Sequence, residues 1–511
     1  MSKNELFLFD ALSAFGLAML NRVPREYHVA AWTSKAMLQT QRLPQNLEIH
    51  HVAMDALNGL ASEAAKATHV VIVLDAFYKR TDKVNLALLS DAIRKMYDAC
   101  DDDHTRAFVF VSTGSVYKDG VFPADENAAV VEKNDVTRTA LEIEHYLENA
   151  SADRALKPLI LRAATPYGPM CASTPYALFQ QTTVLSTLRT TVPRFYKGPI
   201  CPLVHVDDVA AAIYYLMALK RTLELRYNLA DQEAMNLGEM FAVVRQTTEI
   251  PEYTRIVLPH VASFPWLIRI LQKFRYFDTL DELTSRIWKQ VAYGYAIDQT
   301  PSPSLSDFLC ATSCPKLSTK RLADTGFEFE HPSFRTSAKA FYNKLCEDHW
   351  IPDLSQPPCR QDALFNRVYF WQSWKGFLID QENPNTSLTL ELGIDNDMPI
   401  WATHSFSQAP LRGTLTIGDR SPIPIEGNRQ VRHLIDVCSL ATASFHIQIA
   451  ERDLTFKPIP GGEHGLAPYQ KFSLVDADGR VRFTGKLTLD ITPTTVLKSL
   501  KTVNFGVHPH A

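Results

Sequence analysis

The sequence lacks the features that mark several large classes of protein. Lysine and arginine number 52 against 56 aspartates and glutamates, which gives a net charge of −4, and no long basic run occurs. Phosphate backbones are bound by clustered lysine and arginine, so we expect no nucleic acid as a partner. No apolar run reaches the roughly 18 residues needed to cross a bilayer. No basic-then-apolar segment precedes the first expected strand, so we expect neither a transmembrane span nor a secretory signal.

Cysteine is also sparse. The eight cysteines are scattered along the chain, at positions 100, 171, 201, 310, 314, 346, 359 and 438. Such a distribution suits a reducing compartment, and we expect a cytoplasmic protein. Cys310 and Cys314 are four residues apart, but no second Cys/His pair lies at ligand spacing. We therefore expect no bound metal.

Length and composition are those of a globular protein with more than one core. The chain has 511 residues, of which 46% are apolar and 21% charged. A chain of this length exceeds a single domain. A polar segment bearing prolines, at residues 353–364, is typical of a linker. We therefore expect one domain over residues 1–352 and another over residues 365–495, with a tail at 496–511.

The second of these regions has the period of β-strands. Apolar and polar residues alternate in several runs between residues 365 and 495, which indicates half-buried strands. Asp478-Gly479 between two such runs predicts a hairpin turn. We expect a separate antiparallel all-β domain, either a sandwich or an open barrel. Gly413-Thr414-Leu415-Thr416, followed later by a Tyr-x-x-x-x-Leu-x-Asp-x-x-Gly-Arg pattern from Tyr469 to Arg480, loosely resembles the accessory β-domain of cholesterol-oxidase-like flavoproteins, which implies a lipid-related context.

The first region carries several motifs in the order of a known family. In chain order they are the buried strand Phe108 to Thr113 with Val116-Tyr117 after it, the strand Leu159 to Arg162 with Tyr167-Gly168-Pro169 after it, and Leu203 to Ala210. This order resembles the extended short-chain dehydrogenases/reductases of the NAD-dependent epimerase/dehydratase type. The resemblance implies an α/β fold with a Rossmann-type doubly wound parallel sheet and a cleft at the carboxyl ends of its strands. It also implies that segments at about 170–205 and 235–350 form the substrate-binding part.

The catalytic pair of that family is missing. A Tyr-x-x-x-Lys pair follows the strand in the family, because a tyrosine beside a lysine serves as the proton donor. The best register here places Val136 and Ala140 at those positions, so the sequence predicts an atypical member without the standard dyad. Tyr146 lies on the same expected helix but ten positions too late to serve. Other side chains that could act as a substitute acid are Tyr117, Lys133 and Tyr167.

Four side chains remain as candidates for catalysis. The hydroxyls of Thr113 and Tyr117 are the ones that we expect to face a substrate. Arg162 and His205, which belong to the resembling motifs, are the further candidates.

The glycines that bind a dinucleotide are also mostly missing. The turn after the first expected strand should read Gly-x-x-Gly-x-x-Gly, because glycines let backbone amides approach the pyrophosphate. Asp10, Ser13 and Gly16 stand at those positions. We expect weak dinucleotide binding or none, with Ser13, Gly16 and Tyr167 as the candidate contacts for NAD or NADP. Trp32-Thr33-Ser34-Lys35 lacks an acidic residue for a ribose hydroxyl, which favours NADP if a cofactor binds at all.

One apolar stretch bears on the substrate. Residues 257–277 are apolar and aromatic with three intermittent basic residues. Such a segment can contact a membrane surface, or it can form a helix that covers a substrate pocket. A comparable insertion occurs in the hydroxysteroid-dehydrogenase-like branch of the family, so the resemblance favours a hydrophobic small molecule over a nucleotide sugar.

Taken as a sequence, the chain resembles a divergent short-chain dehydrogenase/reductase that acts on a hydrophobic metabolite. Without the dyad it either retains a cofactor without standard catalysis or performs a non-redox step such as isomerisation, cyclisation or dehydration. Two alternatives stay open. One is a catalytically silent scaffold or assembly protein, and the other is an NAD(P)-dependent oxidoreductase with a displaced acid.

Overall fold

The structure is a computed structural model of the whole chain. The description covers residues 4–34, 49–74, 85–118, 123–169, 171–188, 192–219, 224–250, 252–258, 284–285, 288–289, 291–297, 315–356, 359, 367–385, 387–399, 407–431, 440–449, 452–459, 469–490 and 504–505. The apolar stretch at 257–277 lies outside these residues except for its first two positions.

A seven-stranded parallel sheet forms the N-terminal part of the molecule. Its strand order is β11-β6-β5-β4-β1-β2-β3, and every pairing is parallel. The strands are β1 (Asn4–Phe9), β2 (Tyr27–Thr33), β3 (Ile49–His51), β4 (His69–Val73), β5 (Ala107–Thr113), β6 (Pro158–Ala163) and β11 (Arg226–Leu229). The order reverses beside β1, which is the arrangement of a doubly wound sheet. The Rossmann-type fold expected from the sequence is therefore confirmed.

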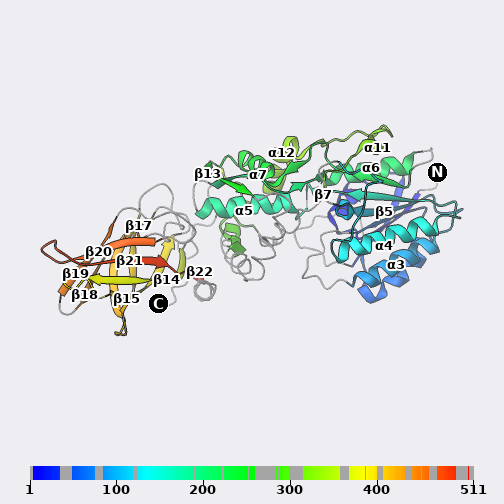
Figure 1. The fold of residues 1–511 in the computed structure, drawn as a ribbon. Helices are drawn as coiled ribbons and strands as arrows, with labels where there is room; N and C mark the ends of the chain where they lie inside the picture. Colours follow the sequence, from blue (N-terminus) through cyan, green and yellow to red (C-terminus); the bar gives the residue numbers. More distant parts are fainter. Residues whose placement is uncertain are drawn as a thin grey trace.

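Helices cover both faces of this sheet. Figure 1 shows α3 and α4 on one side and α6 on the other, where α6 packs against α1. The helical elements of this part are α1 (Ala14–Asn21), η1 (Met54–Gly59), α2 (Leu60–Ala64), α3 (Leu86–Ala99), η2 (Gly114–Val116), α4 (Asp135–Ala150) and α6 (Val206–Ala218). Because both faces of the sheet are covered, its central strands are mostly apolar. All five residues of β4, for example, are buried.

Polar side chains cap the first turns of several helices. Asn134 caps α4 in a capping box with Thr137, and Asn85 accepts a hydrogen bond from the Leu88 amide at the start of α3. Ser13 does the same for α1, through the amide of Gly16. These caps fix the first residues of α1 and α4, the helices that follow β1 and β5 in the chain.

A second core lies beside the parallel sheet. It is built from three short strand pairs, β7–β10, β9–β12 and β8–β13, and from helices that follow them. These elements are β7 (Thr165–Tyr167), α5 (Thr174–Leu188), β8 (Val192–Lys197), β9 (Ile200–Cys201), β10 (Leu203–His205), β12 (Met235–Asn236), α7 (Leu237–Thr247), β13 (Glu252–Leu258) and α12 (Phe334–Glu347). The short helix α11 (Lys320–Ala323) packs instead against β11 and contributes Leu322 to the core of the parallel sheet. Its centre is aromatic, with Tyr167 packed edge-on against Phe334 and Phe341.

The C-terminal part is a closed antiparallel barrel of eight strands. The strands are β14 (Arg367–Asp380), β15 (Ser387–Pro399), β16 (Ser407–Ile417), β17 (Ile423–Val431), β18 (Ser444–Ile449), β19 (Arg452–Ile459), β20 (Tyr469–Val475) and β21 (Val481–Leu489), with the short β22 (Asn504–Phe505) added to β14. The separate antiparallel β-domain is confirmed. It is neither a sandwich nor an open barrel, because β14 pairs with β15 along one edge and with β21 along the other.

The expected hairpin turn joins β20 and β21. Gly479 adopts a φ of 80°, which favours glycine, and its amide donates to the Asp476 carbonyl at 3.0 Å. The barrel is filled by its own side chains, including Trp374, Leu392, Phe445 and Phe456.

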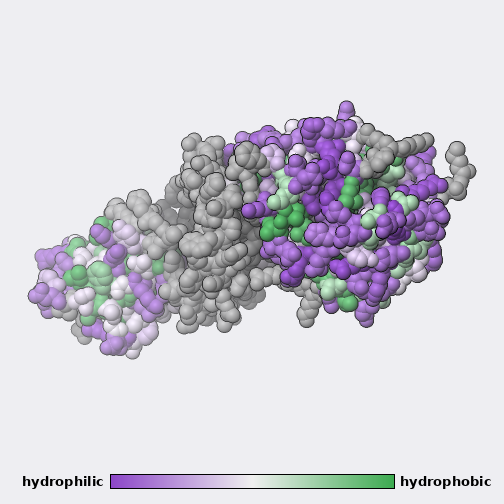
Figure 2. Space-filling model, turned by 45° about the vertical axis from the view of Figure 1, so that its right-hand side comes forward, coloured by the Kyte–Doolittle hydropathy of each residue, from purple (hydrophilic) through white to green (hydrophobic). Residues whose placement is uncertain are grey.

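The surface is mainly polar. Figure 2 shows the N-terminal part covered mostly by hydrophilic residues, with small hydrophobic areas between them. Among the described residues the exposed large hydrophobic side chains are Val131, Phe377, Ile459 and Val481. In the described parts of the chain, no helix combines the length and the apolar character that crossing a membrane requires.

Candidate functional site

The carboxyl ends of β5 and β6 carry a buried ionic network in place of a catalytic pair. Glu144 of α4 accepts from the Arg162 guanidinium at 2.5 and 3.1 Å and from the Ser112 hydroxyl at 2.6 Å. The side chain of Glu144 is fully buried and that of Arg162 is 4% exposed. Burial opposes the charge on Arg162, but the hydrogen bonds to Glu144 outweigh it and raise the pKa of the guanidinium.

The two dyad positions lie on the same helix as Glu144. Val136 is half-buried in the first turn of α4, and Ala140 is fully buried one turn before Glu144. Helix α4 packs against β5 and η2, the elements that carry Thr113. The helix that carries these two aliphatic side chains therefore packs against the end of β5. Tyr146, further along α4, donates instead to the Asp98 carboxylate of α3, at 2.6 and 2.7 Å.

Thr113 and Tyr117 have different surroundings. The Thr113 hydroxyl accepts from the Ser115 amide at 3.1 Å and caps η2. Tyr117 is fully buried, its hydroxyl donates to the Asn228 side chain at 2.7 Å, and Arg162 lies 4.8 Å over its ring. Burial raises the pKa of the Tyr117 phenol. The structure thus brings Tyr117 and Arg162 together in one buried network, with Thr113 at its edge.

The turn after β1 has a left-handed backbone conformation at a residue that is not glycine. Asp10 adopts a φ of 61°, the left-handed conformation that glycine normally supplies at this position. The Ser13 hydroxyl donates to the Asp10 carbonyl at 2.6 Å and accepts from the Gly16 amide at 3.0 Å. One free amide of the first turn, that of Gly16, is therefore used by Ser13 and not left for a phosphate.

Gly16 is required by packing within this turn. A Cβ at this position would lie 2.5 Å from the Asp10 carbonyl oxygen and 2.8 Å from the Ala11 Cα. Residues 10 to 13 are also all buried, at 8% exposure or less. The turn is closely packed against itself, so Gly16 is explained by the close approach of α1 to the strand end.

His205 and Tyr167 lie together at the second core. They are paired in register on β10 and β7, and their rings meet edge to face with centroids 5.0 Å apart. Burial, with His331 and Arg22 nearby, lowers the pKa of His205 to about 3, so its imidazole is neutral. Burial raises the pKa of Tyr167 above its ordinary range, and burial raises that of the neighbouring Asp231 to about 8.

Motif spacing did not identify several of the polar residues around these sites. Glu126 accepts from the Asn228 amide at 3.0 Å, and Asp208 accepts from the Glu330 and His331 amides at 2.8 and 3.0 Å. Asp208 belongs to the motif Leu203 to Ala210, and Asn228 lies in the apolar strand β11, so their polarity inside apolar runs was the available signal. Their partners come from distant segments.

One described cavity, of about 540 Å³, lies away from the strand ends. It is open and polar, beside the edge strand β11, with Glu126, Tyr227, Ser318 and Arg321 in its wall. Its position differs from the crevice at the carboxyl ends of the strands where doubly wound sheets bind ligands.

These features define a Rossmann-type α/β protein whose strand-end site has been rebuilt around a buried ion pair. The model of the family described as the NAD dependent epimerase/dehydratase family matches residues 16–230. The relationship indicated by the motifs is therefore confirmed for this part of the chain. No curated protein matches the sequence.

Solved structures show low identity to this chain. UDP-glucose 4-epimerase of Thermus thermophilus, in complex with NAD, is 17% identical over 66% of this chain and 98% of its own, with a TM-score of 0.48. UDP-glucuronic acid 4-epimerase of Bacillus cereus, in complex with UDP-glucuronic acid and NAD, is 15% identical over 50% of this chain and 87% of its own, with a TM-score of 0.42. Similarity at this level transfers no ligand and no residue role.

Proposed function

We propose that the protein binds a hydrophobic metabolite at the carboxyl ends of β5 and β6 and acts on it by a non-redox step. Isomerisation, cyclisation and dehydration are the reactions of this kind. The observation that carries the proposal is the buried Glu144–Arg162 ion pair on and beside α4. The sequence register that places Val136 and Ala140 at the dyad positions of the same helix supports it.

The ion pair argues against hydride chemistry at this site. Hydride transfer to or from a carbonyl needs an acid/base group that can exchange a proton with the substrate. Glu144 already accepts from Arg162 and Ser112, and Tyr117 already donates to Asn228. Thr113 accepts from a backbone amide and can itself donate, so in this proposal its hydroxyl orients the substrate.

The same replacement favours an apolar ligand. A phenol and an ammonium both need polar partners or water, whereas valine and alanine need neither. A sugar nucleotide placed against the half-buried Val136 would leave hydroxyl groups without hydrogen-bond partners, which costs free energy. A hydrophobic molecule would bury its surface there without that cost.

The turn after β1 is consistent with a minor role for a dinucleotide. The Asp10 carboxylate and the Ser13 side chain stand where glycines let a pyrophosphate approach, and Ser13 itself caps the helix. In this proposal a nicotinamide cofactor, NAD or NADP, binds weakly or not at all and takes no part in the reaction.

Thermal-shift measurements test the ligand class. The full chain and a truncation ending at Ile351 would be compared against sterol-like, polyketide-like and sugar-nucleotide ligands. We expect stabilisation by members of the first two groups, and a larger response in the full chain if the C-terminal barrel helps to close the site. Stabilisation by sugar nucleotides alone would contradict the proposal.

A variant that restores the dyad sharpens this test. Val136→Tyr combined with Ala140→Lys puts a phenol and an ammonium back beside Thr113, and the response to hydrophobic ligands should fall. Val131→Tyr is the matched control, because Val131 is 39% exposed and lies before α4. An unchanged response in the double variant would place the ligand elsewhere.

Mass spectrometry of a ligand after incubation tests the reaction. Isomerisation and cyclisation leave the mass unchanged, and dehydration removes one water. Neither changes the absorbance of an added nicotinamide cofactor. Turnover that oxidises or reduces such a cofactor would favour an oxidoreductase with a displaced acid, and ligand binding with no reaction would favour a binding or scaffold protein.

A further inference from the structure

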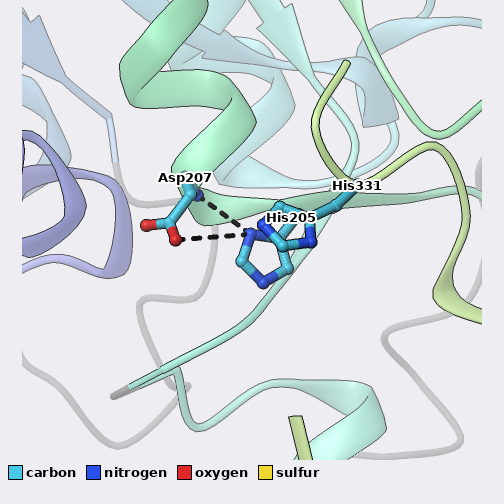
Figure 3. A group of neighbouring side chains, drawn as sticks. All are labelled: His205, Asp207 and His331. Atoms are coloured by element: carbon cyan, nitrogen blue, oxygen red, sulfur yellow. Dashed lines mark hydrogen bonds and ion pairs between the residues drawn. The ribbon is translucent and has the colours of Figure 1, made fainter. Parts of the chain in front are cut away.

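Two imidazoles and a carboxylate converge where β10 meets α6. His205 ends β10, Asp207 lies in the first turn of α6, and His331 lies shortly before α12. One ligand atom of each residue lies within 4.8 Å of those of the other two. Figure 3 shows the Asp207 carboxylate directed towards the Nδ1 side of His205, with the ring of His331 beside that of His205.

The fold holds these three side chains in place independently. His205 caps α6, with its Nδ1 accepting from the Asp207 amide at 3.2 Å. The buried Asp208 carboxylate accepts from the amides of Glu330 and His331, which fixes the distant segment against α6. The His205 and His331 rings are stacked, with centroids 3.7 Å apart and planes at 27°.

The two oxygens of Asp207 have different neighbours. Oδ1 lies 3.6 Å from the Arg22 guanidinium, and Oδ2 lies 3.9 Å from His205 Nδ1. Arg22 is itself engaged by Glu330, at 2.6 Å. The carboxylate is thus oriented by Arg22 so that its second oxygen faces the imidazoles.

The net charge of the side chains around the group favours binding of a cation. Asp207, Asp208 and Glu330 supply three carboxylates, and Arg22 supplies one guanidinium, within one connected set of contacts. Taking all four as ionised, this leaves two negative charges, because three minus one is two. A divalent cation would neutralise them, although Arg22 and the start of α6 both oppose it.

We propose that His205, Asp207 and His331 bind a divalent transition metal of the zinc class, with water at the remaining position. Two imidazole nitrogens and one carboxylate oxygen suit zinc, cobalt, nickel or copper, and they suit calcium or magnesium poorly. The metal would tie the segment before α12 to the start of α6. This site consists of other residues than the strand-end site of the proposed function, and the two proposals are tested independently.

Binding requires a small rearrangement. With metal–nitrogen bonds of about 2.0–2.1 Å, two imidazoles in tetrahedral coordination have ring centres roughly 5 Å apart. The stacked rings must therefore separate by more than about 1 Å. His331 is the ring that would move, because it is partly exposed, whereas His205 is buried. Coordination through His205 Nδ1 would also replace its long bond to the Asp207 amide.

Cobalt titration of the full chain tests the site. The protein would be stripped with a chelator and titrated with Co²⁺, with zinc stoichiometry measured separately by equilibrium dialysis. We expect one ion per chain with a dissociation constant tighter than about 0.1 mM. The cobalt spectrum should show nitrogen and oxygen coordination and no thiolate charge-transfer band, which separates this site from the cysteines.

Two variants remove one ligand each. His331→Gln and Asp207→Asn should each weaken binding by about tenfold or more. His28→Gln is the matched control, because His28 is 66% exposed and pairs with Glu5 far from the group. Since Asp207→Asn keeps the size of the side chain and the capped amide, it decides the question if His331→Gln does not fold.

Several results would overturn the proposal. These are no binding at millimolar cobalt or zinc, a thiolate band in the bound spectrum, or unchanged affinity in a folded His331→Gln or Asp207→Asn variant. Loss of binding in the two ligand variants with full binding in His28→Gln would support it.

Discussion

Replacing Glu144 by glutamine tests whether the strand-end network is the buried ion pair that the structure describes. The change keeps the shape of the side chain and removes its charge. Arg162 then stays buried, with its guanidinium facing a neutral amide. Breaking a buried pair by removing one partner costs about 3–5 kcal/mol, because the remaining charge has lost its compensation. Glu144 fits that case, since its side chain is fully buried and accepts from both Arg162 and Ser112.

The same helix provides a matched control one turn later. Glu148 pairs with Arg226 at 2.5 Å, but its side chain is 43% exposed. Glu148→Gln should therefore cost about 1 kcal/mol or less. The two substitutions are chemically identical on one helix, so the difference between them reports on burial together with the additional partners of Glu144, which are Arg162 and Ser112.

Pulsed hydrogen exchange at increasing urea concentration is the suitable assay. Peptides from β5 and β6 report on the N-terminal part alone, which matters because a chain with several cores need not unfold in one step. With a urea m-value of about 3 kcal/mol per molar, Glu144→Gln should lower the midpoint by roughly 1–1.7 M. Equal shifts for Glu144→Gln and Glu148→Gln would refute the reasoning.

A double replacement separates the pair from its parts. Glu144→Leu with Arg162→Met replaces both charges by apolar groups of similar size. Such replacements of buried pairs are often neutral or stabilising. The double variant should therefore recover most of the stability that Glu144→Gln loses, and a double variant less stable than Glu144→Gln would contradict this account.

Three further predictions concern other parts of the N-terminal region. Gly16→Ala should lower the unfolding free energy by about 1–3 kcal/mol, because the new Cβ meets backbone atoms at 2.5 and 2.8 Å, whereas at Gly59 a Cβ meets no heavy atom within 4 Å. Thermal unfolding of Gly16→Ala and Gly59→Ala measures this, and equal effects would count against it. Calorimetry with NAD, NADH, NADP and NADPH should give dissociation constants no tighter than about 0.1 mM, roughly −5.5 kcal/mol, and Asp10→Gly should tighten binding by removing a carboxylate. Micromolar binding by the unchanged protein would overturn that expectation. Burial lowers the pKa of His69 to about 4, so its neutral form contributes stability above pH 6.5 that is lost, up to about 3 kcal/mol, as the pH falls towards 4. His69→Gln should flatten the pH dependence of the melting temperature between pH 4 and 7, and an unchanged slope would show that other groups cause it.

The parallel sheet could be predicted because its evidence is local. Each central strand is a short apolar run bounded by a cap or a turn, and such runs are visible in the sequence. The register that placed Val136 and Ala140 at the dyad positions also depended on spacing within one segment. The structure places both residues on α4, a helix that packs against β5 and η2. The register itself stays a prediction.

The contacts of the site could not be predicted in the same way. Glu144 meets Arg162 and Ser112 only because β5 and β6 are neighbours in the sheet and α4 packs over them. His331 meets His205 only through the Asp208 carboxylate, which holds a segment far along the chain. Spacing in a sequence carries no information about such pairs, because they are decided by tertiary packing.

The barrel shows the same limit. Alternation of apolar and polar residues predicts strands, but closure depends on residues 374–380 of β14 pairing with residues 483–489 of β21. Nothing in either strand alone distinguishes a closed sheet from an open one.

That closing pair has a consequence for the order of events on the ribosome. Among the described residues, β14 is the first barrel strand to be synthesised and β21 is the last long one, so the seam between them cannot form until residues 483–489 have left the exit tunnel. Pairing so distant in the chain is slow, because the loop must close before the contacts form. The parallel sheet, made from earlier residues, can fold while the barrel strands are still emerging. During that interval β14 has an unpaired edge, and a shortage of chaperones during translation should harm the C-terminal region more than the N-terminal one.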